Sequence, residues 1–156
     1  MKIWTHLSPE RIFLDADLAD KNAVLQFIGL TLGKSGAVKN PDAVYSAIKK
    51  REDMMSTGIG GGIGIPHALT PEVNDIEILL MRLKTPIPFE ALDKKPVDIV
   101  FALVVHENET TLHLRTLAGI AGLCKKQGFL KMVRSSGSVQ DVLEEIKKIE
   151  EGDKVH

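Results

Sequence analysis

Apolar residues recur at helical spacing in the first third of the chain. A helical pattern starts at about Asp20, and its apolar positions follow the i, i+3, i+4, i+7 spacing of one helix face. Gly33 and Gly36 then supply stop signals. A second helix is predicted to begin with Asn40 as the capping residue and to end near Arg51.

Two further helices are predicted in the last third of the chain. The stretch 111–126 carries one apolar stripe, and Ser138 with Asp141 three residues later forms a capping-box pattern before the last helix. Between these helical regions, 76–83 and 97–105 have the length and β-branched content of strands. Helices and strands alternate, which predicts an α/β layered fold in a single domain covering residues 1–156.

Composition narrows the classes of function. The 20 basic and 21 acidic residues give a net charge of −1, which argues against a nucleic-acid-binding protein. The longest apolar runs contain charged residues and are shorter than a membrane span, and the first residues lack the apolar core of a signal peptide. The single Cys124 cannot form an internal disulfide. We therefore expect a cytoplasmic protein without direct membrane insertion.

The most unusual stretch is a glycine-rich segment that leads into a histidine. Residues 54–65 contain five glycines and are predicted to form a loop with at most short extended pieces. Backbone N–H groups of such a loop can converge on one anion. Pro66 restricts the backbone just before His67, whose neutral imidazole is a competent nucleophile. The candidate phosphate-binding residues are Ser56, Thr57, Gly58, Gly60 and Gly62.

The glycine segment fits neither nucleotide-binding motif. Its spacing departs from G-x-G-x-x-G, and the sequence 29–35 is one residue short of a P-loop and lies within a helical pattern. We expect no ATP or NAD, no other cofactor, and no metal, since the histidines and single cysteine lack zinc spacing. A flexible connection followed by a surface histidine remains the alternative on local evidence.

Two more residues are candidates for the same chemistry. His113 lies in the first turns of the third predicted helix, where a helix N-terminus favours a neutral ring and bound anions. It is equally typical of a half-buried core histidine. Arg51 could pair with phosphoryl oxygens through its planar guanidinium, or it could belong to a solvated last helical turn.

Three segments together resemble the fructose/mannitol-type (type 2) IIA family of the bacterial phosphotransferase system. The likeness extends over roughly residues 14–149. These segments are Arg51-Glu52 with 56–60 and 65–67, then 85–89 with Asp93 and 96–98, and finally Glu107-Asn108 with His113-Leu114.

The resemblance implies both a fold and roles for the candidate residues. The family fold is a mixed five-stranded sheet flanked by helices. His67 would be the phosphoryl acceptor, charged from an HPr-type phosphocarrier. His113 would hydrogen-bond the phosphorylated ring or the transferring group, and Arg51 would help to hold the negative charge. An apolar rim around the reactive ring is expected from Ile59, Ile63, Ile65 and Leu69.

Three positions depart from the family pattern. Gly61 stands where relatives often carry Asn or another polar residue, which leaves a backbone N–H to compensate. Gly64 stands where Ala is usual. His106 replaces a common proline and would either add a third imidazole near the site or lie on its rim.

The segments 83–93 and 96–105 most resemble the nitrogen-regulatory branch of the family. Such a protein acts through partner binding that depends on its phosphorylation state. The alternative is a fructose-type IIA subunit that passes the phosphoryl group to a IIB domain. An alternative of another class is an interaction module that keeps the fold without transfer.

Overall fold

Two long antiparallel strands form the centre of the sheet and are apolar on both faces. They are β5 (Ile76–Ile87) and β6 (Val97–His106), paired with Leu80 opposite Phe101. Neighbouring residues of each strand alternate between two separate hydrophobic cores. Continuous apolar sequence is expected where helices cover both faces of a sheet. The computed structural model describes residues 2–152, so Met1 and residues 153–156 of the predicted domain lie outside the described residues.

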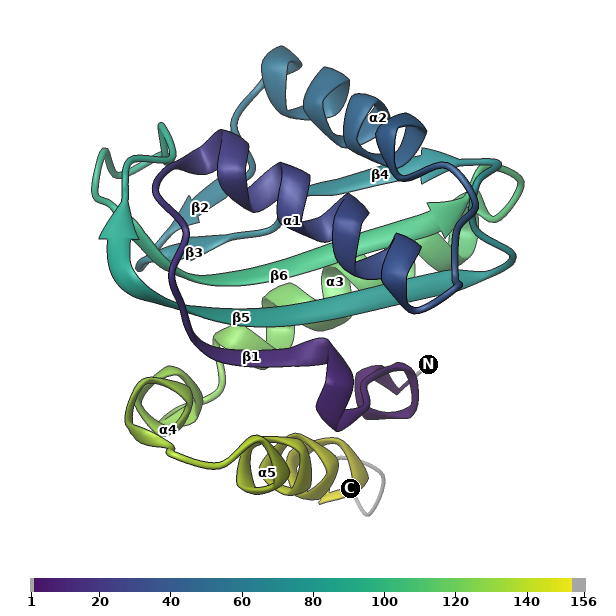
Figure 1. The fold of residues 1–156 in the computed structure, drawn as a ribbon. Coiled ribbons are helices and arrows are strands. Elements are labelled where there is room, and N and C mark those ends of the chain that lie inside the picture. The colour runs from purple at the N-terminus through teal and green to yellow at the C-terminus, as the bar shows by residue number, and fades with distance from the viewer. Residues whose placement is uncertain (1, 153–156) are drawn as a thin grey trace.

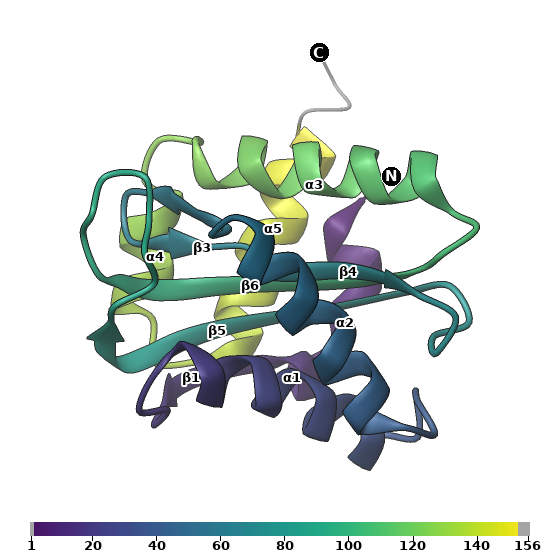
Figure 2. The same cartoon turned by 90° about the horizontal axis from the view of Figure 1, so that it is seen from above.

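Helices cover both faces of this sheet (Figure 1). On one face lie α1 (Lys21–Lys34) and α2 (Pro41–Met54). The other face carries α3 (Thr110–Cys124), α4 (Phe129–Ser135) and α5 (Val139–Gly152), together with the short helical turns Ile3–His6 and Pro9–Arg11. Seen from above, α3 runs alongside the sheet next to β4, whereas α2 crosses the sheet obliquely (Figure 2). The predicted α/β layered fold is confirmed.

The sheet is mixed and has six strands, in the order β1-β5-β6-β3-β2, with β4 also paired to β6. β1 (Ile12–Ala16) is parallel to β5, and β3 (Ile63–Gly64) and β4 (His67–Thr70) are parallel to β6, whereas β2 (Gly58–Gly60) is antiparallel to β3. The five strands implied by the resemblance become six because β3 and β4 pair with successive segments of β6 in one continuous register. Between them stands Pro66, which has no N–H to donate.

The caps predicted at Asn40 and Ser138 are confirmed, and Asp20, predicted only as the approximate start of a helix, is a further cap. The Asp20 carboxylate accepts a hydrogen bond from Ala23 N at 2.8 Å, and the Asn40 side chain accepts one from Ala43 N at 3.1 Å. Ser138 Oγ accepts one from Asp141 N at 3.3 Å. α2 extends three residues beyond its predicted end. The elements β1 and α4 were not predicted, because five and seven residues are too few to display a period. Within residues 2–152, no helix has the length and apolar character needed to cross a membrane.

The pairing of α1 with α2 depends on close backbone approach. A methyl group added to Gly29 would lie 2.8 Å from the carbonyl oxygen of Pro41, and one added to Gly33 would lie 2.4 Å from Pro41 Cγ. These glycines therefore let the start of α2 rest directly on α1. This contact sets the direction of α2 and so the position of its C-terminal end.

We expect Gly29→Ala to destabilise the protein by about 1–3 kcal/mol, because the methyl group overlaps a backbone atom that cannot move freely. Gly122→Ala is the matched control, since Gly122 also lies in a helix but has open space around its Cα. The control should gain about 0.5–1 kcal/mol from its higher helix propensity. Urea unfolding monitored by circular dichroism measures both. Equal effects would show that the α1–α2 contact is not close.

Candidate active site

His67 is the first residue of β4, which within residues 2–152 pairs on one side with β6 and is unpaired on the other. Its neighbour Ala68 belongs to the core beneath α1 and α2. Because side chains alternate along a strand, His67 is on the opposite face, where α3 lies. It pairs in register with Leu103 of β6, and Pro66 O accepts a hydrogen bond from Leu103 N at 3.0 Å. Backbone pairing on both sides of the Pro66–His67 bond thus holds the position of the imidazole.

A hydrogen bond to the main chain fixes the state of the His67 ring. Its Nδ1 lies 2.7 Å from the carbonyl oxygen of Ile65. A carbonyl only accepts, so Nδ1 carries the proton and donates. In the neutral ring the lone pair is then on Nε2. Burial lowers the pKa of His67 below its usual value and outweighs the opposite effect of the Ile65 carbonyl, which keeps Nε2 unprotonated near pH 7.

His113 faces the same ring from α3. The centroids of the two imidazoles are 5.2 Å apart and their planes are inclined at 51°. The side chain is 7% exposed, and burial together with the neighbouring His67 and Arg51 lowers its pKa to about 4. His113 is therefore neutral at pH 7. Among the described residues its buried Nδ1 has no hydrogen-bond partner. An unpaired acceptor is tolerated better than an unpaired N–H, which favours Nε2 as the donor.

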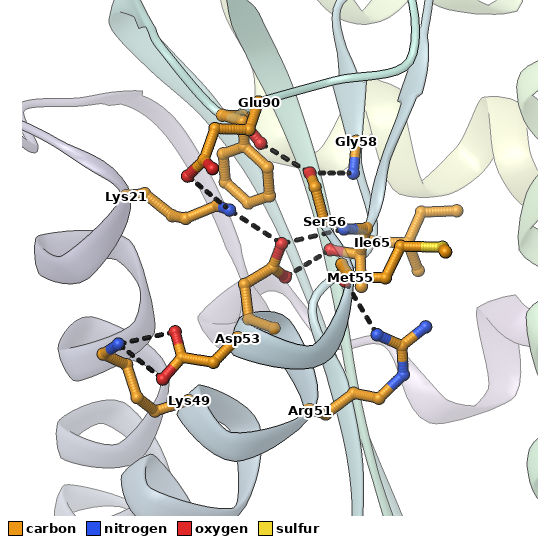
Figure 3. Close-up of polar contacts among 12 residues, drawn as sticks. Lys21, Lys49, Arg51, Asp53, Met55, Ser56, Gly58, Ile65 and Glu90 are labelled. Atoms are coloured by element: carbon orange, nitrogen blue, oxygen red, sulfur yellow. Dashed lines mark hydrogen bonds and ion pairs between the residues drawn. The ribbon is translucent and has the colours of Figure 1, made fainter.

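Arg51 completes the group from the last turn of α2. Its Nη1 donates to the carbonyl oxygen of Met55 at 2.8 Å (Figure 3). The guanidinium charge lowers the pKa of both His67 and His113, so it acts on both rings. A shallow pocket of about 340 Å³ contains all three residues. Its lining is Ala47, Lys50, Arg51, Met54, His67, Ala68, Leu69 and His113.

The glycine-rich segment lies outside this pocket, as judged from the described residues. Ser56 Oγ donates to Phe89 O and accepts from Gly58 N at 3.1 Å. Both donors of Thr57 bind the Glu52 carboxylate. Gly62 O accepts from two amides of β6.

These contacts occupy much of the hydrogen-bonding capacity of the segment. The assignment of Ser56, Thr57, Gly58, Gly60 and Gly62 as phosphate ligands stays a prediction. Their contacts favour another task, which is to hold the segment rigidly against the sheet. The N–H of Gly61, expected to compensate for a missing polar side chain, donates to Asp93 Oδ2 at 3.1 Å.

The predicted apolar rim is partly wrong. Ile63 and Ile65 are 5% and 4% exposed and belong to the hydrophobic core on the α3 side: Ile63 is held by the pairing of β3 with β6, and Ile65 N donates to Thr57 O. Leu69 lines the pocket, and Ile59 is exposed. Sequence reasoning missed Met54, which lines the pocket and is 77% exposed. The available signal was an apolar residue on the polar side of the helix. The stripe predicted for the third helix is wrong at Leu114, which is 62% exposed, because α3 buries the face of His113, Thr116 and Ile120.

His106 does not reach the pocket. It pairs with Thr70 at the far end of β4, and its Nδ1 accepts a hydrogen bond from Asn108 N at 3.1 Å. This contact stabilises the turn between β6 and α3. Of the two alternatives for His106, the third imidazole at the site is therefore wrong, because His106 does not line the pocket.

Comparisons with known proteins identify the class to which this fold and pocket belong. The family described as phosphoenolpyruvate-dependent sugar phosphotransferase system, EIIA 2, matches residues 5–149. The chain belongs to this family.

Its relatives include both branches that the sequence suggested. A nitrogen regulatory protein of Bradyrhizobium diazoefficiens is 34% identical over 142 residues, covering 91% of this chain and 92% of the relative. The crystal structure of nitrogen regulatory protein IIA-Ntr from Neisseria meningitidis has a TM-score of 0.86 at 29% identity, covering 92% of this chain and 98% of that one. The fructose-specific EIIABC component of Bacillus subtilis is 31% identical over 144 residues, which are 92% of this chain and 23% of that protein.

The buried His113 should make stability depend on pH. Its pKa is about 4 in the folded protein and ordinary, near 6.5, in the unfolded chain, so the unfolded chain binds more protons between these values. The contribution of His113 to the free energy of unfolding is therefore fully present above about pH 6.5. It falls by up to about 3 kcal/mol as the pH is lowered toward 4. In His113→Gln the slope of unfolding free energy against pH should be shallower across this window. Urea titrations at several pH values measure it, and an unchanged slope would contradict a buried neutral ring.

Proposed function

We propose that Nε2 of His67 accepts a phosphoryl group from an HPr-type phosphocarrier. The observation that carries the proposal is the hydrogen bond from Nδ1 to the Ile65 carbonyl, in a pocket shared with Arg51 and His113. It leaves a neutral ring with one lone pair, and that lone pair belongs to Nε2. Membership of the phosphotransferase family supports the same chemistry.

The transfer passes between two imidazoles. Nε2 of His67 attacks phosphorus as the bond to the donor's ring nitrogen breaks, and that bonding pair returns to the donor nitrogen. No proton needs to move when the donor ring carries a proton on its other nitrogen and leaves as a neutral imidazole, because His67 holds its own proton on Nδ1 throughout. Arg51 and the N–H of His113 donate hydrogen bonds to the phosphoryl oxygens and stabilise their negative charge, and positioning with charge stabilisation provides most of the catalysis.

The surface around the pocket suits a transient protein partner. Met54 of α2 and Leu69 of β4 line the pocket and are both exposed, so they form an apolar border. Flexible methionines adapt to more than one partner surface. Such a border fits a donor and an acceptor that dock in turn on the same face.

For the branch, we infer a nitrogen-regulatory IIA protein whose partner binding depends on phosphorylation. The similarity to nitrogen regulatory proteins over most of both chains supports this assignment. The alternative is a fructose-type IIA subunit that delivers the phosphoryl group to a IIB domain, and the similarity to a fructose-specific component supports it. An interaction module without transfer is the third candidate.

Incubation with enzyme I, HPr and phosphoenolpyruvate should add one phosphoryl group, detected by intact-protein mass spectrometry. The group should be absent in His67→Ala, which removes the acceptor nitrogen. His106→Ala is the matched control and should be phosphorylated normally, because His106 lies outside the pocket. Phosphorus NMR of the product should show substitution at Nε2. A wild-type protein that takes up no phosphoryl group would favour the interaction module.

The two branches are separated by discharge of the phosphoprotein. A regulatory IIA protein should keep its phosphoryl group on the minute timescale when a fructose-type IIB domain is added in equal amount, because its surface is not matched to that acceptor. The phosphoprotein band is followed over time on a gel that resolves phosphohistidine. A cognate fructose IIA–IIB pair provides the positive control, and discharge at the same rate would establish the fructose branch.

A further inference from the structure

A carboxylate is buried at the C-terminal end of α2, next to the candidate arginine. Glu52 is 4% exposed and lies in the last turn of the helix. A negative charge at this end opposes the helix dipole, and a buried charge loses its hydration. Such a group persists only where specific partners compensate it, so its contacts indicate what it does.

Three donors converge on this carboxylate. Lys21 Nζ of α1 lies 2.9 Å from Oε2, Thr57 N donates to Oε2 at 2.8 Å, and Thr57 Oγ1 donates to Oε1 at 2.6 Å. Lys21 is held in turn by the Phe89 ring, 4.8 Å from its centroid, and by Glu90 at 3.5 Å (Figure 3). Glu52 thus joins both helices of one face to the glycine-rich segment.

The hydrogen bonds continue from Thr57 to the reactive ring. Thr57 O accepts from Ile65 N at 3.0 Å, and Ile65 O accepts from His67 Nδ1 at 2.7 Å. Two residues therefore separate the Glu52 carboxylate from the imidazole. A rotation of the Thr57 carbonyl would move the Ile65 N–H that is bonded to it. Because the N–H and the C=O of Ile65 are attached to the same residue, the Ile65 carbonyl would then move as well.

We propose that Glu52 and Thr57 are positioning residues that lock the Ile65 carbonyl, and with it the Nδ1–H tautomer and the orientation of His67. The relevance of this inference to phosphoryl transfer rests on the proposed function. The tautomer of His67 can be measured whether or not the protein transfers a phosphoryl group. Lys21 neutralises the buried carboxylate and keeps it in place. The same anchor holds the last turn of α2, so that Arg51 stays over the pocket.

The geometry distinguishes this role from a simple ion pair. If Glu52 only neutralised Lys21, one carboxylate oxygen would suffice and Thr57 would be incidental. Instead, both oxygens bind donors of Thr57, the one residue whose carbonyl receives the Ile65 amide. The exposed pair of Lys49 and Asp53, one residue further along α2, has no such continuation in the described contacts.

The test compares Glu52→Gln and Thr57→Val with Asp53→Asn. Glutamine keeps the shape but its amide nitrogen cannot accept from Thr57, and valine keeps the volume without the hydroxyl donor. Asp53→Asn removes the neighbouring exposed ion pair and is the matched control. In the unphosphorylated proteins, nitrogen-15 NMR of the His67 ring reports the tautomer. We expect Nδ1–H alone in wild type and Asp53→Asn, and a mixture of both tautomers in Glu52→Gln and Thr57→Val.

The rate of phosphorylation by HPr provides the second measurement. Glu52→Gln should lower kcat about 10-fold with little change in KM for HPr, since orientation is lost and docking is kept. Thr57→Ser retains both donors and should restore wild-type behaviour. Circular dichroism confirms folding, and Thr57→Val decides the question if Glu52→Gln does not fold.

The outcomes separate the two proposals. An unchanged Nδ1–H tautomer in both Glu52→Gln and Thr57→Val would overturn the positioning role. A wild-type protein that never accepts a phosphoryl group would overturn the proposed function, yet the tautomer comparison would still decide the role of Glu52. Equal loss in Asp53→Asn would show a general effect at the end of α2, which also overturns the proposal.

Discussion

The hydrogen bond between His67 Nδ1 and the Ile65 carbonyl is the interaction on which the site depends. It selects the tautomer, and it restrains the ring through the backbone, which is the least mobile partner a side chain can have. The carbonyl is available because it points away from β6: its neighbour Pro66 O accepts from Leu103 N of β6, whereas Ile65 N donates to Thr57 O on the other side. Pro66, which cannot donate, is therefore part of how the imidazole is presented.

The rest of the fold brings two further groups to this ring from opposite faces of the sheet. β4 is short and, within residues 2–152, pairs only with β6, so its outer edge is open to residues from α2 and α3. His113 comes from the first turns of α3, and Arg51 comes from the last turn of α2. Close packing of α1 on the start of α2 sets the direction of the second helix. A pocket at a sheet edge of this kind is accessible to another protein, whereas a pocket within either core is not.

Local sequence patterns were sufficient for much of this arrangement. Caps, helical stripes and apolar strands depend on residues a few positions apart, and the three pocket residues were found by combining such patterns with family resemblance. The patterns failed where partners are distant in sequence. Ile63 is a core residue because it pairs with Ile99 on β6. Polar groups of the glycine-rich segment form hydrogen bonds with Glu52, Phe89 and Asp93. Nothing within residues 54–65 specifies those partners. Glu52 was also missed, because a glutamate near a helix end is ordinarily exposed.

The electrostatics of the pocket explain why two histidines can share it. Burial and the Arg51 charge lower the pKa of both rings, and the neighbouring His67 lowers the pKa of His113 further, so both rings are neutral and neither repels the other as a cation. On the proposed function, the arriving phosphoryl group brings up to two negative charges into the same space. Burial lowers the pKa of His113, whereas a nearby phosphoryl anion raises it. The anion therefore favours a His113 ring that is protonated or donates a strong hydrogen bond. A pocket arranged to keep its histidines uncharged when empty is thereby able to hold a dianion when loaded. The buried Glu52 nearby raises the pKa of His67, but this effect is smaller than those of burial and of Arg51, which lower it.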